Sequence, residues 1–229
     1  MSPARRCLTG PPGKHKMKSE NYRVGSTRRG DIKMRVCIYG AASTEIPEIY
    51  TKTAYSLCKK LAERGHSLVF GAGDGGMMGA SARGFHDAGA HVMGVAPTFF
   101  KETVIEKLYD DSDVIVFTES MGMRKSVMES NADAFIVMPG GIGTYDEFFQ
   151  ILTLKQLKVI RQPIVLFNVN HFYDPMKQLM DTAMEEKFLR SDTMELFRVF
   201  SDSMLDELIH FIETEPLSEI GTVESKYGA

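Results

Sequence analysis

Residues 134–147 read AFIVMPGGIGTYDE, an apolar run that ends in a proline and three glycines and then continues as a helical pattern. A short run without polar residues predicts a strand that is covered on both faces, as the strands of a parallel sheet are. The glycines allow the chain to turn sharply, and a helix over residues 144–160 is predicted directly behind them. This strand–turn–helix unit is the building block of an α/β fold.

The same alternation of short apolar runs and helical patterns continues along the chain. Glycines and prolines mark most of the boundaries. The alternation predicts an α/β protein, a Rossmann-like doubly wound parallel sheet with helices on both faces in a single domain. The predicted strands are 34–39, 67–70, 91–95, 114–118, 134–138 and 163–168, and the predicted helices are 46–64, 77–88, 120–131, 144–160, 173–187 and 203–213.

Charge is distributed unevenly along the 229 residues. Of the 27 basic and 30 acidic residues, eight bases and one acid fall in residues 1–30, which leaves a formal net charge of −10 for the rest. We interpret residues 1–33 as a disordered basic arm, with a targeting segment as the less favoured alternative, and residues 217–229 as a tail. The domain is predicted to span residues 34–216, and its acidity argues against nucleic-acid binding.

The composition also bears on the cellular compartment of the protein and on whether it binds a metal. No apolar run approaches the roughly 18 residues that span a bilayer, so we expect no membrane association. The three cysteines, Cys7, Cys37 and Cys58, are odd in number and widely spaced, which argues against a disulfide framework and favours a reducing compartment, the cytoplasm. Neither they nor the six histidines have metal-ligand spacing, so no metal site is expected.

In a doubly wound sheet, ligands bind where the strands end, so the turns after the strands are informative. The first such turn, over residues 71–79, formally contains GxGxxG at Gly71, Gly73 and Gly76. It follows the second predicted strand, and no acidic residue stands about 20 positions beyond, which disfavours a dinucleotide site. Two interpretations stay open: a backbone that approaches an anion at a helix start, or a tightly packed turn.

The second turn runs from Pro139 to Thr144 and has glycines at 140, 141 and 143. Free N–H groups and the helix dipole at such a start form a phosphate cradle, and the absence of GK[ST] excludes a P-loop. Thr144 and Glu147 also fit a capping box, with Thr144 as N-cap and Glu147 at N3. Alternatively, Glu147 faces the ligand crevice and serves acid–base chemistry.

The third turn, over residues 119–125, brings Arg124 and Lys125 to the start of a helix. The plain interpretation is a solvated basic pair on a surface helix. Two cations beside two glycine-rich turns of an acidic domain fit an anion site better, because an arginine fork can bind a phosphate or sugar hydroxyls.

Three of these segments together resemble one known family. The sequence of residues 139–147, PGGIGTYDE, resembles the PGGxGTxxE signature of the Lonely Guy family of cytokinin riboside 5′-monophosphate phosphoribohydrolases, often labelled lysine decarboxylase-like. Arg124-Lys125 matches the RK of the family's second motif, residues 71–79 resemble its GGGxxGLMG turn, and residues 94–97 its GVxP.

The resemblance implies hydrolysis of the N-glycosidic bond of a nucleoside 5′-monophosphate such as AMP, without a cofactor or metal, in a homodimer with sites near the interface. It places Arg124 and Glu147 on the catalytic positions. Together with the glycine turns, it gives these expected substrate-binding residues: Gly73, Gly75, Gly76, Lys125, Gly140, Gly141, Ile142, Gly143, Thr144, Tyr145, Asp146 and Thr153.

This chemistry agrees with the residue types. Cleavage of a ribosyl C–N bond builds positive charge on the sugar, which Glu147 can stabilise while it orients or deprotonates water. Arg124 can hold ribose or phosphate. The alternative is a non-catalytic nucleotide-binding or carrier protein of the same fold, and a nicotinamide-dependent dehydrogenase is weakened by the misplaced GxGxxG.

Overall fold

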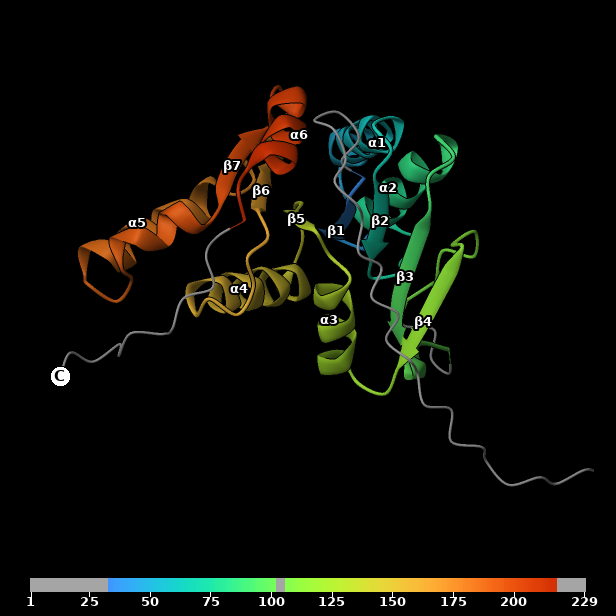
Figure 1. The fold of residues 1–229 in the computed structure, drawn as a ribbon, viewed down its shortest axis with the longest axis horizontal. Coiled ribbons are helices and arrows are strands. Elements are labelled where there is room, and N and C mark those ends of the chain that lie inside the picture. Colours follow the sequence, from blue (N-terminus) through green and yellow to red (C-terminus); the bar gives the residue numbers. More distant parts are fainter. Residues whose placement is uncertain (1–32, 102–105, 218–229) are drawn as a thin grey trace, which may run out of the picture. The chain divides into compact units, whose positions relative to one another are not determined.

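The computed structural model describes residues 33–101 and 106–217. Within them the strands form one seven-stranded sheet in the order β4-β3-β2-β1-β5-β6-β7, and every pair of neighbours is parallel. The predicted α/β class and doubly wound parallel sheet are therefore confirmed (Figure 1). The strands are β1 (Arg35–Tyr39), β2 (Ser67–Phe70), β3 (Val92–Pro97), β4 (Val114–Thr118), β5 (Ala134–Val137), β6 (Ile164–Asn168) and β7 (Arg198–Ser201).

Successive residues of the central strands enter two different cores, because side chains alternate across a sheet. In β1, Val36 and Ile38 belong to one cluster of buried residues, whereas Cys37 and Tyr39 belong to the other. All four are at most 1% exposed. This two-sided burial explains why the buried positions of the central strands are apolar, which was the pattern that predicted these strands.

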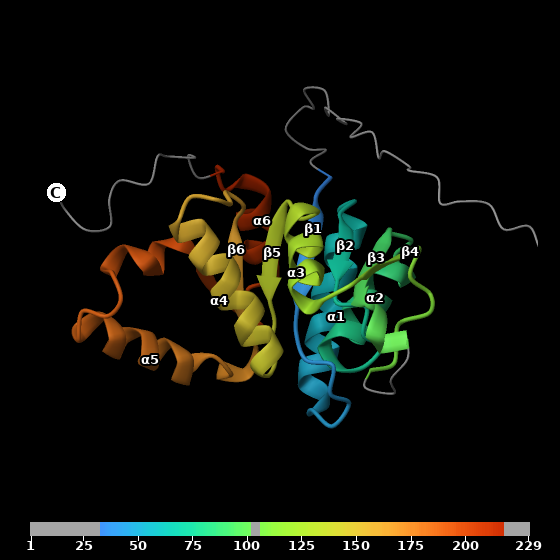
Figure 2. The ribbon, with the colours of Figure 1, turned by 90° about the horizontal axis from the view of Figure 1, so that it is seen from below.

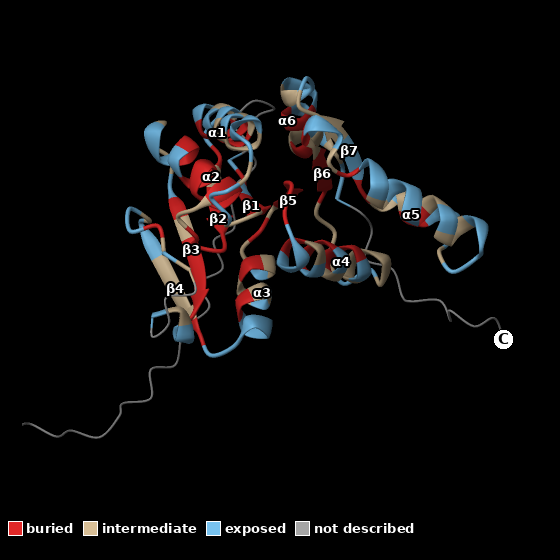
Figure 3. Ribbon diagram, turned by 180° about the vertical axis from the view of Figure 1, so that it is seen from behind, coloured by how far each residue is buried: buried red, intermediate tan, exposed pale blue. Residues whose placement is uncertain are grey.

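Helices cover both faces of the sheet. One core includes residues of α1, α2 and α6, and the other includes residues of α3, α4 and α5. Figure 1 shows α1, α2 and α6 above the strands, and Figure 2, seen from below, has α3 and α4 in front of them. Figure 3 shows buried residues concentrated on the strands and on one side of α4, whereas α5 is mostly exposed. The helices are α1 (Glu48–Glu63), α2 (Gly76–Asp87), α3 (Met121–Ser130), α4 (Ile142–Gln156), α5 (Asp174–Glu185) and α6 (Leu205–Thr214).

The winding direction reverses between β1 and β5. From β1 the chain moves outward through β2, β3 and β4, and it then returns to add β5, β6 and β7 on the other side of β1. The connections that leave the two neighbouring strands diverge there, which opens a crevice at their carboxyl ends. The turn after β5, which contains the PGGIGT sequence, lies at this switch point.

Most predicted boundaries lie within two residues of the observed ones, but α4 ends at Gln156, four residues before its predicted end, and one strand was not predicted. Residues 67–70 and 114–118 were predicted as strands and are β2 and β4. Strand β7 was not predicted, because only four residues form it at the sheet edge and Arg198 and Val199 are exposed. The expectation that α4 begins at Thr144 is wrong, since the helix starts at Ile142. The basic arm and the tail were predicted for residues 1–33 and 217–229, and all of these except Lys33 and Leu217 lie outside the described residues.

Candidate active site

The turn between β5 and α4 starts the helix three residues earlier than the capping-box prediction required, because the N-cap is Gly141 and not Thr144. Gly141 is the N-cap, with φ −92° and ψ −154°, and no side chain caps the helix. Thr144 therefore stands at the third helical position, and Glu147 lies farther along the helix than N3. The capping box is wrong, because Gly141 takes the extended N-cap conformation itself and leaves Ile142 and Gly143 free to be helical.

The start of α4 is open. A Cβ atom added at Gly141 or at Gly143 would meet no other atom within 4 Å, and Ile142 is 82% exposed. The N–H groups of the first turn have no acceptor within the helix, so they present the positive end of the helix dipole to this space. The preceding Gly140 differs, because a Cβ there would lie 2.1 Å from the Thr144 hydroxyl and 3.0 Å from the Ala41 nitrogen. Packing explains Gly140, whereas Gly141 and Gly143 leave open space at the start of the helix.

The start of α2, in contrast, is filled by backbone. A Cβ at Gly75 would lie 2.2 Å from the Ala42 carbonyl oxygen, and Gly76 has a φ of +54°. The Met78 nitrogen donates to the Ala41 carbonyl at 3.2 Å. Carbonyl groups of the loop after β1 thus occupy the positions that an anion would take. Of the two interpretations of this turn, the structure favours the tightly packed turn at Gly75 and Gly76.

Arg124, on α3, joins three other elements. Its Nε donates to the Val95 carbonyl at 3.0 Å, its Nη2 to the Gly71 carbonyl at 3.2 Å, and its Nη1 to Glu147 Oε1 at 3.0 Å. A Cβ at Gly71 would lie 1.8 Å from Nη2, so the glycine makes room for the guanidinium. Arg124 is 5% exposed. It is therefore a buried cation and not a member of a solvated basic pair.

Glu147 is the partner of Arg124 and is 8% exposed. Burial raises the pKa of the Glu147 carboxyl to about 7, although the neighbouring Arg124 guanidinium opposes the shift. A carboxyl group with a pKa close to neutral can accept and return a proton at physiological pH, as acid–base catalysis requires. The pair also combines a proton acceptor and a fixed positive charge at the carboxyl ends of the strands.

A second ion pair links α3 and α4, and its residues are the sequence neighbours of Arg124 and Glu147. Lys125 Nζ lies 2.7 Å from Asp146 Oδ2, and the lysine side chain is 12% exposed. Beside it, the Tyr145 ring contacts Tyr173, whose hydroxyl donates to the Met138 carbonyl at 2.7 Å. The Lys125 ammonium is thus held by α4 in this structure, and the hydrogen bond to Met138 fixes the end of β5.

The structure brings some of the predicted site residues together and separates others. Arg124 binds Glu147, and Lys125 binds Asp146, both in the first half of α4. Gly75 and Gly76 are packed on the loop after β1 instead. Thr153 is exposed, and its hydroxyl bonds the Phe149 carbonyl of its own helix. It stands six residues beyond Glu147, about 9 Å farther along the axis, so it does not join the pair within this chain.

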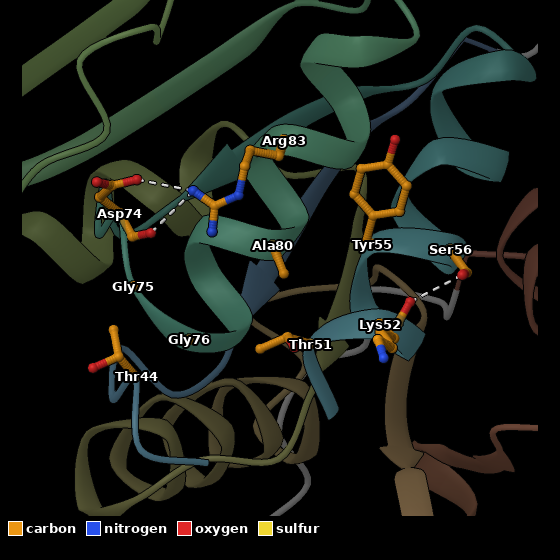
Figure 4. A pocket seen from close by; sticks show the side chains of 10 residues that line it. All are labelled: Thr44, Thr51, Lys52, Tyr55, Ser56, Asp74, Gly75, Gly76, Ala80 and Arg83. Carbon is orange, nitrogen blue, oxygen red and sulfur yellow. Dashed lines mark hydrogen bonds and ion pairs between the residues drawn. The ribbon is translucent and has the colours of Figure 1, made fainter. Parts of the chain in front are cut away.

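A cavity of about 630 Å³ lies between α1 and the start of α2 (Figure 4). It contains neither Arg124 nor Glu147. Its polar side chains already have partners: Arg83 binds Asp74, and the Ser56 hydroxyl donates to the Lys52 carbonyl. We therefore do not assign the predicted chemistry to it. The residues that line it are Thr44, Thr51, Lys52, Tyr55, Ser56, Asp74, Gly75, Gly76, Ala80 and Arg83.

One residue of the site, Glu106, was missed by the sequence analysis. Its Oε1 atom is buried and has no hydrogen-bond partner in the part of the chain that the structure describes. Burial raises the pKa of this carboxyl, and the charge of Arg124 opposes the shift. A Cβ at Gly73 would lie 2.1 Å from the same oxygen. No motif includes Glu106, because only the folding of residues 106–109 against the turn after β2 brings it there.

Among residues 33–101 and 106–217, no group of three or more histidine, cysteine, aspartate and glutamate residues could hold a metal ion. No helix in these ranges is both long enough and apolar enough to cross a membrane.

Comparison with known proteins identifies close relatives of this site-bearing domain. The family described as "Possible lysine decarboxylase" matches residues 78–209. The cytokinin riboside 5′-monophosphate phosphoribohydrolase LOG of Oryza sativa subsp. japonica is 34% identical over 191 residues, which are 82% of this chain and 77% of the relative. The corresponding LOG2 enzyme of Arabidopsis thaliana is 37% identical over 158 residues, which are 69% of this chain and 73% of the relative.

Solved structures share the fold at lower identity. The molybdenum cofactor carrier protein of Chlamydomonas reinhardtii has a TM-score of 0.59 at 20% identity and covers 80% of this chain and 97% of its own. The molybdenum cofactor binding protein of Rippkaea orientalis has the same TM-score and identity and covers 80% and 99%. At this identity the similarity supports the Rossmann-like fold alone.

Proposed function

The chain belongs to the Lonely Guy (LOG) family, and on this premise we propose that it hydrolyses the N-glycosidic bond of nucleoside 5′-monophosphates. The substrates are AMP and cytokinin riboside 5′-monophosphates, and the products are the free base and ribose 5-phosphate. The observation that carries the proposal is the buried Arg124–Glu147 pair, 3.0 Å apart, beside an open helix start.

We place the 5′-phosphate at the start of α4. The space at Gly141 and Gly143 admits an anion, and the unpaired N–H groups and the helix dipole attract it. Because the domain as a whole is acidic, a phosphate has to be attracted by local groups such as these N–H groups. Binding energy from the phosphate then holds the sugar in position for a reaction at C1′, away from the phosphate itself.

Glu147 acts at the C1′–N bond that is broken. The C1′–N bond breaks and its electron pair leaves on the base, so positive charge develops on the ribose, which an ionised carboxylate stabilises. A water oxygen forms the new C1′–O bond, and Glu147 takes the proton that this water loses. The proton can return from Glu147 to the base nitrogen, because the pKa of about 7 lets the group serve in both directions.

Arg124 positions Glu147 and has donors left for the substrate. A guanidinium has five N–H donors, and three of its hydrogen bonds go to Val95, Gly71 and Glu147. The remaining donors can contact ribose or phosphate oxygens. Because two backbone carbonyls fix the plane of the group, it reaches the substrate without the cost of ordering a flexible side chain.

The alternative function, a nucleotide carrier, is less well supported. A carrier would use the same phosphate cradle, but it has no use for a carboxyl group whose pKa is raised to about 7 beside a buried arginine. The carrier proteins of similar structure are only 20% identical to this chain, whereas the LOG enzymes reach 37%.

We propose further that the protein is a cytoplasmic homodimer. Helix α4 carries exposed apolar side chains at Ile142 and Phe149, and Val159 is exposed just beyond its end; burial against a second copy would remove them from water. Such an interface on α4 would also give exposed Thr153 a role near a substrate. Cys37 and Cys58 are free and buried, which fits a reducing compartment. The mass of the purified protein in solution tests the dimer.

A panel assay tests the proposed activity. The purified protein is incubated with AMP, GMP, CMP, UMP and isopentenyladenosine 5′-monophosphate, and free base and ribose 5-phosphate are quantified separately. We expect release from the adenine nucleotides. Tight binding of AMP without any released base after long incubation would support the carrier instead.

A further inference from the structure

An acidic side chain outside every sequence motif, Glu106, lies beside the Arg124 site. Its carboxyl group is close enough to Arg124 for the two charges to interact. Its Oε1 atom is buried and finds no donor in the described parts of the chain. A buried acceptor without a donor is costly, so a fold that keeps one at a binding site indicates that another molecule supplies the donor.

The backbone holds Glu106 in place. The segment that follows it pairs with the turn after β2: the Asp74 nitrogen donates to the Lys107 carbonyl at 2.8 Å, and the Tyr109 nitrogen to the Ala72 carbonyl at 2.8 Å. Gly73 lies between these two bonds, and a Cβ there would be 2.1 Å from Glu106 Oε1. The glycine thus leaves room for the carboxylate, as Gly71 does for the Arg124 guanidinium.

The charge of Arg124 acts on two carboxylates: it forms an ion pair with Glu147, and it opposes the rise in the pKa of Glu106 that burial causes. Its Nη1 binds Glu147, and its Nη2 binds the carbonyl of Gly71, two residues before the glycine that receives Glu106. A second carboxylate here repels a phosphate, which is drawn instead to the start of α4. The part of a nucleotide that remains next to the reacting C1′ atom is the ribose ring with its two hydroxyl donors.

We propose that the Glu106 carboxylate accepts hydrogen bonds from the 2′- and 3′-hydroxyls of the substrate ribose and so selects ribonucleotides over deoxyribonucleotides. The inference rests on the proposed function of the same site. A carboxylate offers two oxygens and a vicinal diol offers two donors, so the two groups match. A site built around a substrate hydroxyl discriminates strongly against the analogue that lacks it, because its own polar group is then left buried and unpaired.

The test is a set of binding measurements. Calorimetry gives the Kd of AMP, 2′-deoxy-AMP and 3′-deoxy-AMP for the Glu147→Gln protein, in which turnover is expected to be lost, and for the same protein carrying Glu106→Gln. Glu106→Gln is expected to weaken AMP binding about 10- to 100-fold, as the loss of hydrogen bonds to a charged group does. The Kd values of the two deoxy analogues should change far less. Asp110→Asn, which removes an exposed carboxylate from the same segment, should change none of the three Kd values.

The outcomes separate the two proposals. Equal loss of affinity for all three nucleotides, or no loss for any, overturns the role of Glu106, and the proposed function stands if the wild-type protein still hydrolyses AMP. Binding of AMP with this hydroxyl dependence but without hydrolysis overturns the enzyme and keeps the role of Glu106. Absence of AMP binding overturns both. If Glu106→Gln melts at a much lower temperature than its parent, Glu106→Ala replaces it in the same comparison.

Discussion

Nη1 of Arg124 lies 3.0 Å from Oε1 of Glu147, and the two side chains, 23 residues apart in sequence, are both almost completely buried. A buried ion pair is seldom a net gain in stability, because removal of two charges from water costs about as much as their attraction returns. Its presence at the end of the sheet is better explained by chemistry than by folding.

Arg124→Lys keeps the charge but loses the fork that spans three acceptors. The Val95 and Gly71 carbonyls lose a donor, so we expect the free energy of unfolding to fall by about 2 kcal/mol and kcat to fall at least about 100-fold. Denaturant unfolding and initial rates with AMP measure both. Arg83→Lys is the matched control, since Arg83 is half-exposed and binds Asp74, outside the proposed site. Unchanged kcat in Arg124→Lys would contradict a role for the fixed guanidinium.

The pH dependence of kcat/KM reports the ionisation of Glu147. The carboxylate must be ionised to take a proton from water, and burial raises its pKa to about 7. We therefore expect kcat/KM to be low at pH 5, where the group is protonated, and to rise through an apparent pKa of about 7 to a plateau. Initial rates between pH 5 and 9 at constant ionic strength measure this. A profile that is flat from pH 5 to pH 7 would show that no buried carboxyl group acts as the base.

Three glycines of one turn should respond differently to alanine. Gly143→Ala places its Cβ in open space within a helix, so stability should rise by about 0.5 kcal/mol, while the methyl group enters the phosphate cradle and raises KM about tenfold or more. Gly141→Ala should raise KM likewise. Gly140→Ala meets the Thr144 side chain and should destabilise the fold instead. Unfolding curves and KM for AMP separate the two effects, and unchanged KM in Gly143→Ala would place the phosphate elsewhere.

His66 couples stability to pH far from the site. Its Nδ1 accepts from the Met34 nitrogen at 3.2 Å, its Nε2 lies 3.0 Å from Glu213 on α6, and burial lowers its pKa. Between the lowered pKa of His66 in the folded protein and its pKa of about 6.5 in the unfolded chain, the histidine is protonated only in the unfolded chain. Its contribution to stability is therefore lost as pH falls below about 6.5. The loss of unfolding free energy from pH 7.5 to 5.5 should be smaller in His66→Gln than in the wild type. An equal loss would show that His66 is protonated without cost in the fold.

The sequence is most predictive where one physical requirement dominates a segment. Burial on both faces leaves no polar residue in β5 and none in β1 after the exposed Arg35, so these strands can be recognised directly. The glycines of PGGIGT and the charges of Arg124 and Glu147 are informative for a similar reason, because a turn at a helix start and a site for an anion tolerate few other residues.

Features that depend on tertiary contacts could not be read in the same way. The start of α4 moved to Ile142 because Gly141 caps it with its backbone, whereas the sequence offers Thr144 as a better side-chain cap. Lys125 was expected to offer a charge to a ligand, yet Asp146 binds it. Glu106 reaches the site only through an isolated bridge between Gly73 and Leu108, and no local pattern reports such a bridge.

The most direct test compares the wild-type protein with Glu147→Gln in one time course with AMP at pH 7.5. Glu129→Gln is the control, since Glu129 is a half-buried carboxylate that also has a raised pKa but accepts a hydrogen bond from Gln150 and not from Arg124. We predict that the wild type and Glu129→Gln release adenine and ribose 5-phosphate in equal amounts, and that Glu147→Gln, folded and able to bind AMP, is slower by a factor of about 100 or more. Release of adenine by Glu147→Gln at the wild-type rate, or none by the wild type, would contradict the account.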